Sequence, residues 1–309
     1  MSNTPRAIAI SQSSLSVLLH DYAELTKLRV TSLIVLTAWT GFYFAAFKSG
    51  VSSFSWTLFH ALIGIALVSG GTAGFNEVIE CDTDAHMRRT ATRPLPARRM
   101  GLTHASIVCS ALIIGGATYL LLATNALTAL LTLATSVFYL GVYTPLKRVS
   151  PVCTFMGAFS GAMPPILGWT ALRGRVDFAA IVLFGILFFW QFPHFYSIAW
   201  LYREDYESAA IRMLPVVHSD GRSTAREIMV YSGLLVPISL LPTYIGLAGR
   251  IYLVGAFLLS SGLFYYGLRL ALCDQPANSP HSKAPARHLL RATVIYLPLL
   301  FLLMMLNVA

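Results

Sequence analysis

Carboxylate and amide side chains recur at four-residue intervals in one segment of the sequence, where they could bind a metal ion. Asn76, Glu80 and Asp84 are each four residues apart. On an α-helix this spacing advances about 40° per step, so the three side chains project from one stripe. Oxygen ligands suit Mg²⁺, which completes its octahedral shell with water and substrate phosphates. The spacing therefore predicts a magnesium site that also holds a diphosphate.

Arginines follow this acidic stripe directly. Arg88 lies at the next four-residue step after Asp84, and Arg93 precedes Pro94. A guanidinium binds phosphate through paired, planar hydrogen bonds. We therefore expect Arg88 to contact the diphosphate, whereas Arg93 is interpreted equally well as a phosphate contact or as an anchor that orients the chain in a membrane.

A second acidic group occurs more than a hundred residues later, at Tyr202-Arg203-Glu204-Asp205-Tyr206-Glu207. Two carboxylate clusters that face one cavity could hold two metal ions bridged by a diphosphate. We expect Asp205 to be a metal ligand; a helix cap or an ion pair with Arg203 is the alternative. Four further basic residues at the ends of apolar segments are candidates for the diphosphate or for an acidic acceptor, with a role in membrane topology as the alternative: Lys27, Arg29, Lys147 and Arg148.

His194 is the histidine with the most unusual surroundings. It lies in the apolar string Trp190-Gln191-Phe192-Pro193-His194-Phe195. A single histidine in such a segment is often a hydrogen-bonded core residue, but neutral imidazole is also a good partner for iron or a porphyrin. Both interpretations stay open at this point.

The composition is that of a membrane protein, so membrane-spanning helices must position these residues. Of 309 residues, 56% are hydrophobic and only 11% are charged, against roughly 25% charged in a soluble domain. Apolar runs of about 20 residues predict an all-α bundle of nine transmembrane helices. The predicted spans are Val30–Phe47, Ser55–Ile79, Ala105–Ala123, Leu127–Tyr143, Val152–Leu172, Phe178–Leu201, Ile228–Leu247, Ile251–Ala271 and Leu289–Asn307.

The basic residues indicate how this bundle is oriented. If the N-terminus is cytoplasmic, 18 of the 22 Lys and Arg residues fall on the cytoplasmic side, as the positive-inside rule favours. The net charge of +9 therefore reports topology and contact with membrane lipid, and we expect no nucleic acid partner. The same orientation places the candidate active site in the cytoplasm and the C-terminus outside. We expect residues 1–24 to be a flexible cytoplasmic tail and residues 25–309 to form one intramembrane domain.

Several strings of the sequence resemble those of a known family. The Asn-xxx-acid-xxx-Asp pattern after the second span and the Asp-Tyr pair after the sixth resemble the UbiA superfamily of intramembrane prenyltransferases. Within it, local strings between residues 25 and 217 are similar to those of the heme O synthases, or protoheme IX farnesyltransferases. These strings are Leu25–Thr31, Met87–Pro96, Tyr143–Arg148, Gly161–Trp169, Trp190–Phe195 and Asp205-Tyr206 leading to Met213–Val217. The chain departs from the family's usual pattern at Leu28, Glu80 and Ala209, and Ala209 leaves the second Asp-xxx-Asp motif half present.

The resemblance implies a nine-helix membrane enzyme that transfers the farnesyl group of farnesyl diphosphate to the 2-vinyl group of heme B, with addition of water, to give heme O. It implies Mg²⁺ bound by Asn76, Glu80, Asp84 and Asp205, charge neutralisation by Arg88, Lys147 and Arg148, and a position for heme at His194. It further implies the bacterial inner membrane, or alternatively the mitochondrial inner membrane, and a downstream heme A synthase or terminal oxidase assembly as partner.

Two rival functions remain. The first is a UbiA-type enzyme that prenylates an aromatic acceptor for quinone or chlorophyll-type synthesis, and the strings around Met87 and His194 argue against it. The second is a transporter, which would tend to place its charges near the bilayer midplane on broken helices. The acidic residues here lie at helix ends, which disfavours a transporter.

Overall fold

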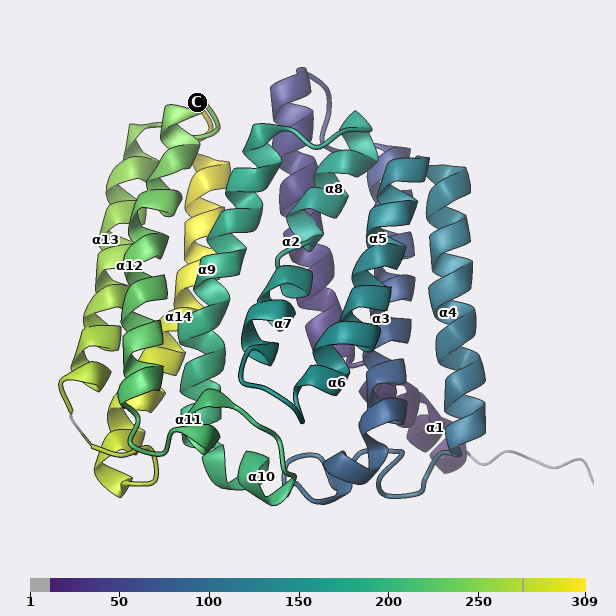
Figure 1. Cartoon of the computed structure of the whole chain (residues 1–309). Coiled ribbons are helices and arrows are strands. Elements are labelled where there is room, and N and C mark those ends of the chain that lie inside the picture. The colour runs from purple at the N-terminus through teal and green to yellow at the C-terminus, as the bar shows by residue number, and fades with distance from the viewer. Residues whose placement is uncertain (1–11, 274) are drawn as a thin grey trace, which may run out of the picture.

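In the computed structural model, residues 12–273 and 275–309 are described, and within them the chain forms helices and loops without a strand. Eight helical segments in this part of the chain are long and apolar enough to cross a membrane, and they run side by side as a bundle (Figure 1). They are α2 (Leu28–Ser49), α3 (Trp56–Ala85), α4 (Leu102–Ala123), the continuous run of α5 (Ala126–Phe138), η1 (Tyr139–Tyr143) and α6 (Thr144–Leu146), α9 (Phe178–Leu201), α12 (Arg222–Tyr244), α13 (Arg250–Ala271) and α14 (Pro280–Leu306).

The remaining predicted span, residues 152–172, is not a single helix. It consists of α7 (Cys153–Gly161) and α8 (Pro164–Arg173), so the count of nine transmembrane helices is not confirmed. The break falls at Pro164-Pro165, because a proline lacks the N–H that would continue the helix and its ring clashes with the preceding turn. Residues 164–171 are all buried, and irregular backbone at membrane depth is tolerated where protein surrounds it.

Glycines allow the broken helix to approach α2 closely. A Cβ added at Gly168 would collide with the main-chain oxygen of Ala38, and one added at Gly41 would collide with the main chain of Pro165. Backbone-to-backbone contact of this kind is the usual role of small residues between helices in a membrane. Here it fixes α8, and with it α7, against the N-terminal half of the bundle.

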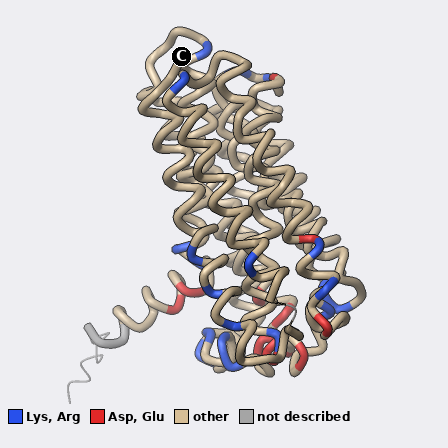
Figure 2. Tube along the Cα trace, turned by 90° about the vertical axis from the view of Figure 1, so that its left-hand side faces the viewer, with Lys and Arg blue, Asp and Glu red and all other residues tan. Residues whose placement is uncertain are grey.

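The short helices gather at one end of the bundle. α10 (Arg203–Ser208), α11 (Leu214–Val217) and the loop of residues 86–101 all lie at the end opposite the C-terminus (Figure 1). Figure 2 shows that Lys, Arg, Asp and Glu concentrate at this same end. The charged loops and the acidic stripe of α3 are therefore on one side of the apolar bundle, as the charge distribution predicted.

The N-terminal segment differs from the expected flexible tail. Residues 12–25 form helix α1 (Gln12–Leu25), while residues 1–11 lie outside the described residues. Asp21 and Leu25 of α1 are buried, and Arg99 donates to Asp21 Oδ1 at 2.9 Å and to Glu24 Oε2 at 3.0 Å. These contacts join α1 to the loop after α3, which explains why the helix forms where a tail was predicted.

Candidate active site

The acidic stripe of α3 lines a cavity at the charged end of the bundle. Asn76, Glu80 and Asp84 all contribute to its wall, and their exposed fractions are only 1%, 9% and 2%. They share the cavity because α3 continues as a regular helix to Ala85, so each turn presents the next side chain of the stripe. The structure thus brings together the three residues that the spacing selected.

Each of these three side chains is paired with a basic residue. Lys147 Nζ lies 2.9 Å from Glu80 Oε2, and Arg93 Nη1 lies 2.6 Å from Asp84 Oδ2. Lys27 Nζ donates to Asn76 Oδ1 at 2.9 Å. Three of the predicted phosphate-binding residues, from three separate parts of the sequence, therefore point into one site.

The cavity carries more positive than negative charge. Among its described lining residues, the acidic side chains are Glu80 and Asp84, and the basic ones are Lys27, Arg89, Arg93 and Lys147. Burial, with Arg93 and Lys147 nearby, lowers the pKa of Lys27 from 10.5 to about 8. A buried site in which nearby basic groups lower the pKa of an ammonium group is a favourable place for an anion.

Arg89, rather than the predicted Arg88, lines the cavity. Its guanidinium lies 5.6 Å from the ring centroid of Tyr202 and 5.4 Å from that of Tyr206, and Nη2 donates to the Tyr206 hydroxyl at 3.3 Å. Arg88 lies outside the lining because α3 ends at Ala85, so the four-residue period does not continue into the loop.

The second predicted acidic site does not reach this cavity. Asp205 lies in α10 and does not line the cavity, whereas the adjacent Tyr206 does. Arg29, Arg88 and Arg148 are exposed and also lie outside the lining. The structure therefore brings six of the eleven predicted site residues together: Lys27, Asn76, Glu80, Asp84, Arg93 and Lys147.

Sequence reasoning missed two tyrosines of the wall. Tyr139 and Tyr143 lie at the two ends of the π-helix η1, with their ring centroids 4.8 Å apart. Lys147 Nζ lies 4.6 Å from the ring centroid of Tyr143. A Cβ on Gly157 would lie 2.6 Å from Tyr143 Cε2, so this glycine makes room for the ring. A π-helical turn often marks a functional site, but the sequence of residues 139–143 alone predicts an ordinary α-helix.

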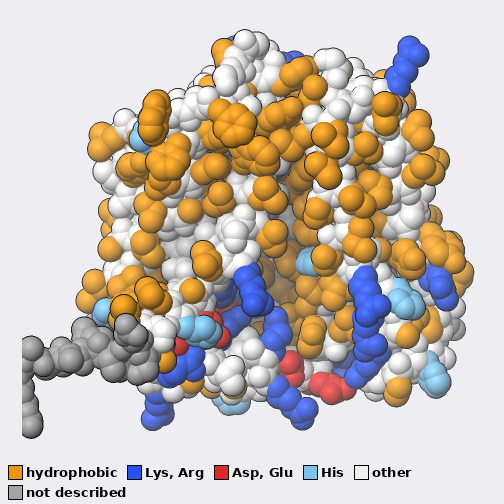
Figure 3. All heavy atoms as spheres, turned by 180° about the vertical axis from the view of Figure 1, so that it is seen from behind, with side chains coloured by type: hydrophobic (Ala, Val, Ile, Leu, Met, Phe, Trp, Pro, Cys, Tyr) orange, Lys and Arg blue, Asp and Glu red, His pale blue; other side chains and the backbone are white. Residues whose placement is uncertain are grey.

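The rest of the wall is apolar. Phe195 and Ile198 of α9 and Ile211 and Met213 of the loop after α10 complete the lining. On the face opposite to that of Figure 1, a hollow runs between hydrophobic side chains above groups of Lys and Arg (Figure 3). Charged groups at one end and an apolar wall beyond them suit an amphipathic substrate with an anionic head and a hydrocarbon tail.

Hydrogen bonds between the loops close the charged end. Ser208 Oγ donates to the main-chain oxygen of His86 at 3.1 Å, and the main-chain N–H of Arg212 donates to the main-chain oxygen of Lys147 at 2.8 Å. Beneath them, Met87 packs with Ala209 and Ile211. The loops after α3 and α9 thus cover the cavity together.

His194 lies beside the cavity but is not part of its lining. Its Nδ1 lies 2.9 Å from Thr293 Oγ1 of α14, and its ring stacks on Trp190 with centroids 4.7 Å apart. The neighbouring Gln191 points elsewhere, since its Nε2 donates to the main-chain oxygen of Ala158 in α7 at 2.9 Å. His194 therefore contacts α14, whereas Gln191 contacts α7.

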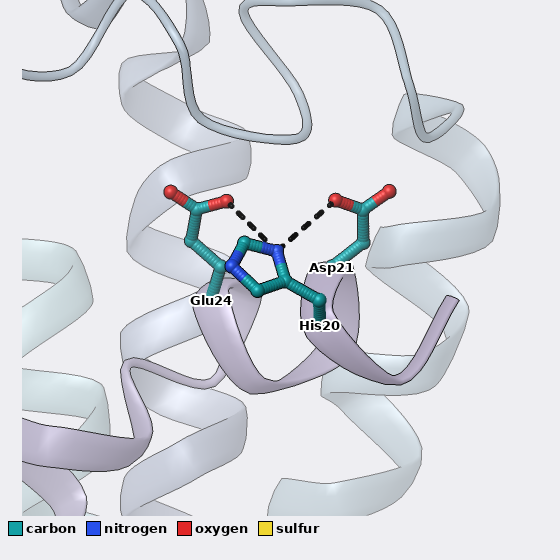
Figure 4. Close-up of side chains that lie close together, drawn as sticks. All are labelled: His20, Asp21 and Glu24. Carbon is teal, nitrogen blue, oxygen red and sulfur yellow. Dashed lines mark ion pairs between the residues drawn. The ribbon is translucent and has the colours of Figure 1, made fainter. Parts of the chain in front are cut away.

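A second group of possible metal ligands lies in α1 (Figure 4). The His20 imidazole has Asp21 and Glu24 carboxylates at 4.0 and 3.9 Å. The same two carboxylate oxygens already accept hydrogen bonds from Arg99. An ion at this position would have to displace that guanidinium, so the group is explained as the anchor of α1.

Comparison with known proteins gives consistent matches over nearly the whole chain. Residues 34–305 match the model of the UbiA prenyltransferase family. A protein of Koribacter versatilis named protoheme IX farnesyltransferase is 59% identical over 307 residues, which cover 99% of each chain. A protein of Solibacter usitatus with the same name is 43% identical and covers 94% of this chain and 99% of its own length.

Solved structures share the fold at low identity. A digeranylgeranylglyceryl phosphate synthase structure has a TM-score of 0.76 at 16% identity and covers 94% of this chain and 98% of its own. A UbiA homolog from Archaeoglobus fulgidus bound to GPP and Mg²⁺ has a TM-score of 0.58 at 17% identity, with 92% and 99% covered.

Proposed function

The chain belongs to the UbiA prenyltransferase family, and from this premise we propose that it transfers the farnesyl group of farnesyl diphosphate to the 2-vinyl group of heme B, with addition of water, to give heme O and diphosphate. The observation that carries the proposal is the 59% identity, over 99% of both chains, with a protein named protoheme IX farnesyltransferase. The cavity supports the same chemistry, because it joins an acidic stripe and surplus basic residues to an apolar wall.

The oxygen donors of α3 fit Mg²⁺. In the ion pairs described above, Glu80 uses Oε2 and Asp84 uses Oδ2, which leaves the second oxygen of each carboxylate for a cation. Asn76 Oδ1 accepts one hydrogen bond from Lys27, and an amide oxygen has two lone pairs. We propose that these three residues hold Mg²⁺, as the ion in the Archaeoglobus fulgidus homolog suggests. When bound, Mg²⁺ would neutralise charge on the diphosphate as it leaves.

The basic residues of the cavity act on the same leaving group. Lys27, Lys147 and Arg93 converge on the acidic stripe, and Arg89, another lining residue, lies over two tyrosine rings. Donors placed where negative charge grows lower the barrier to ionisation. The farnesyl group then becomes an allylic cation, for which the tyrosine rings beside Lys147 offer electron-rich faces.

The apolar wall determines which nucleophile the cation meets. Phe195, Ile198 and Met213 exclude water from the hydrocarbon side of the cavity, so the vinyl group of the acceptor is the nearest electron-rich carbon. Its attack leaves a cation on the acceptor, and water captures that cation to give the hydroxyl of the product. The proton of the attacking water is released to diphosphate or solvent.

We place the enzyme in the inner membrane with its N-terminus and cavity cytoplasmic and its C-terminus outside, because basic residues concentrate at the cavity end (Figure 2). Membrane lipid surrounds the bundle, and the product would pass to a heme A synthase or a terminal oxidase assembly. Asp205, Arg29, Arg88 and Arg148 stay predictions as substrate or metal contacts.

The test uses membranes that contain the chain, supplied with heme B, farnesyl diphosphate and Mg²⁺, and separates the extracted hemes by chromatography and mass. We expect a hydroxyethyl-farnesyl heme that disappears with EDTA and in Asp84→Ala. The matched control is Asp82→Ala, since Asp82 is exposed on the same helix and should leave the product unchanged. Unmodified heme, with prenylation of an added aromatic acceptor instead, would overturn the heme assignment; solute uptake without diphosphate release would overturn the enzyme assignment.

A further inference from the structure

His194 has one ring nitrogen held by protein and one that is open. We propose that Thr293 and Trp190 hold His194 as the Nδ1-protonated tautomer, so that Nε2 ligates the iron of a porphyrin docked against α9 and α14. The proposal rests on the proposed function, because it takes the acceptor to be an iron porphyrin. It adds a site for the acceptor and two positioning residues to the diphosphate cavity already described.

The hydrogen bonds of Thr293 decide the tautomer. Its hydroxyl has a single proton, which it donates to the main-chain oxygen of Leu290 at 2.7 Å. The 2.9 Å contact between Thr293 Oγ1 and His194 Nδ1 must then use a proton on Nδ1, with the hydroxyl oxygen as acceptor. A neutral imidazole protonated at Nδ1 has its lone pair on Nε2, which is the nitrogen available to a metal.

The plane of the ring is fixed as well as its tautomer. Trp190 lies one turn before His194 on α9, and the two rings stack at 17° with centroids 4.7 Å apart. Trp190 Nε1 donates to the main-chain oxygen of Thr293 at 2.8 Å. One residue of α14 therefore anchors both rings. Metal-binding histidines are typically oriented in this way, by a hydrogen bond from the ring nitrogen that does not bind the metal.

Nε2 of His194 has the features of an open ligand position. It makes no hydrogen bond with the described residues, and it is absent from the buried polar atoms that lack a partner. This nitrogen is therefore not completely enclosed, and the residue as a whole is half-buried. A histidine that served only packing between α9 and α14 would gain nothing from an unpaired Nε2 in an apolar span.

The position of this nitrogen suits an acceptor. Ile198, one helical turn after His194 on α9, lines the diphosphate cavity, so a porphyrin on His194 would lie next to that cavity. α14 lies behind α9 in Figure 1, on the face that Figure 3 presents, where hydrophobic side chains surround a hollow. A flat, largely apolar macrocycle can enter such a face from the lipid.

The experiment titrates the purified, detergent-solubilised protein with heme in the absence of farnesyl diphosphate and records the absorption spectrum. We expect a spectrum of histidine-ligated heme that is lost in His194→Ala and restored by added imidazole. Thr293→Val keeps the shape but removes the hydroxyl; it should weaken heme binding about 10-fold or more, and Thr293→Ser should restore it. The matched control is His60→Ala, because His60 Nδ1 is also hydrogen-bonded, to Tyr119, in another part of the bundle.

The possible results distinguish a failure of heme ligation by His194 from a failure of the proposed farnesylation of heme. If His194→Ala binds heme with the wild-type spectrum, the iron ligand is another group and the inference falls. If Thr293→Val matches wild type in affinity and spectrum, the positioning role of Thr293 falls. Farnesylation of heme by a wild-type protein that shows no ligation would overturn this inference and leave the proposed function intact. Ligation through His194 without any farnesylated product would support the site and overturn the proposed function.

Discussion

Replacing Lys147 by methionine tests the electrostatics of the cavity most directly. The substitution keeps the length of the side chain and removes an ammonium that lies 2.9 Å from Glu80 Oε2 and 4.6 Å from the Tyr143 ring centroid. The Lys147 and Glu80 side chains are only 14% and 12% exposed. Solvent therefore screens their interaction much less than it screens a surface ion pair.

The expected loss of stability follows from the Glu80 carboxylate that is left behind. Breaking a buried ion pair by removing one partner costs about 3–5 kcal/mol, because the other charge stays buried. Glu80 Oε2 also accepts a hydrogen bond from Asn76 Nδ2 at 2.9 Å, which offsets part of this cost. We therefore expect a loss near the lower end, about 3 kcal/mol, measured as a lower melting temperature in detergent.

The expected loss of rate is separate and comes from the leaving group. Removing one donor aimed at developing negative charge typically slows the chemical step by about 10²–10³. We expect this factor in single-turnover release of diphosphate at saturating Mg²⁺. A double-mutant cycle with Glu80→Gln separates the effect on stability from the effect on rate. The stability of the double variant should partly recover, because no buried carboxylate is left unpaired. Its rate should be lower than that of Glu80→Gln alone.

Two results would refute the reasoning. Release of diphosphate by Lys147→Met within threefold of wild type would show that the ammonium does not act on the leaving group. A double variant whose rate equals that of Glu80→Gln would show that Lys147 serves only to pair Glu80. Arg93 provides an internal comparison, since it pairs with Asp84 in the same cavity.

Three further outcomes follow from the packing and the donor set. Gly157→Ala should raise the KM for the prenyl diphosphate, because its Cβ would lie 2.6 Å from the Tyr143 ring and push it into the cavity; an unchanged KM would contradict this. Of the three glycine substitutions compared here, Gly168→Ala should lower the melting temperature most, since its Cβ would collide with the Ala38 backbone. Overpacking of this kind costs about 1–3 kcal/mol or more. A wild-type melting temperature would show that α2 and α8 separate freely. Gly141→Ala is the control for both, as it meets nothing within 4 Å. Ca²⁺ should not replace Mg²⁺ in diphosphate release, because it prefers more ligands at longer distances; equal activity with Ca²⁺ would count against the proposed donor set.

The acidic stripe shows how much local sequence can predict. Asn76, Glu80 and Asp84 were selected by spacing alone, and they share one cavity because a single regular helix carries all three. The same rule did not place Arg88 in the cavity lining, because α3 has already ended before that residue. Helical periodicity is informative only as far as the helix continues, and the sequence contains no strong stop signal at His86.

Spacing along one helix could not predict the contacts between segments that are far apart in the sequence. Lys27 and Lys147 were candidates from their positions at segment ends, and Arg93 from its place after the acidic stripe. Their pairing with Asn76, Glu80 and Asp84 depends on how three loops fold over α3. Arg89 and Tyr206 meet for the same reason, although 117 residues separate them.

The sequence by itself determined that the chain is an apolar helical bundle with its charges at one end, because hydropathy and charge are local properties that a membrane sorts directly. It also selected the stripe of oxygen donors at residues 76, 80 and 84, whose members lie on one helix. Only the tertiary structure decided which basic residues face that stripe, that residues 152–172 form two short helices, and that Nδ1 of His194 is held by Thr293. These features arise from packing between helices far apart in the chain, and no local pattern of residues encodes such contacts.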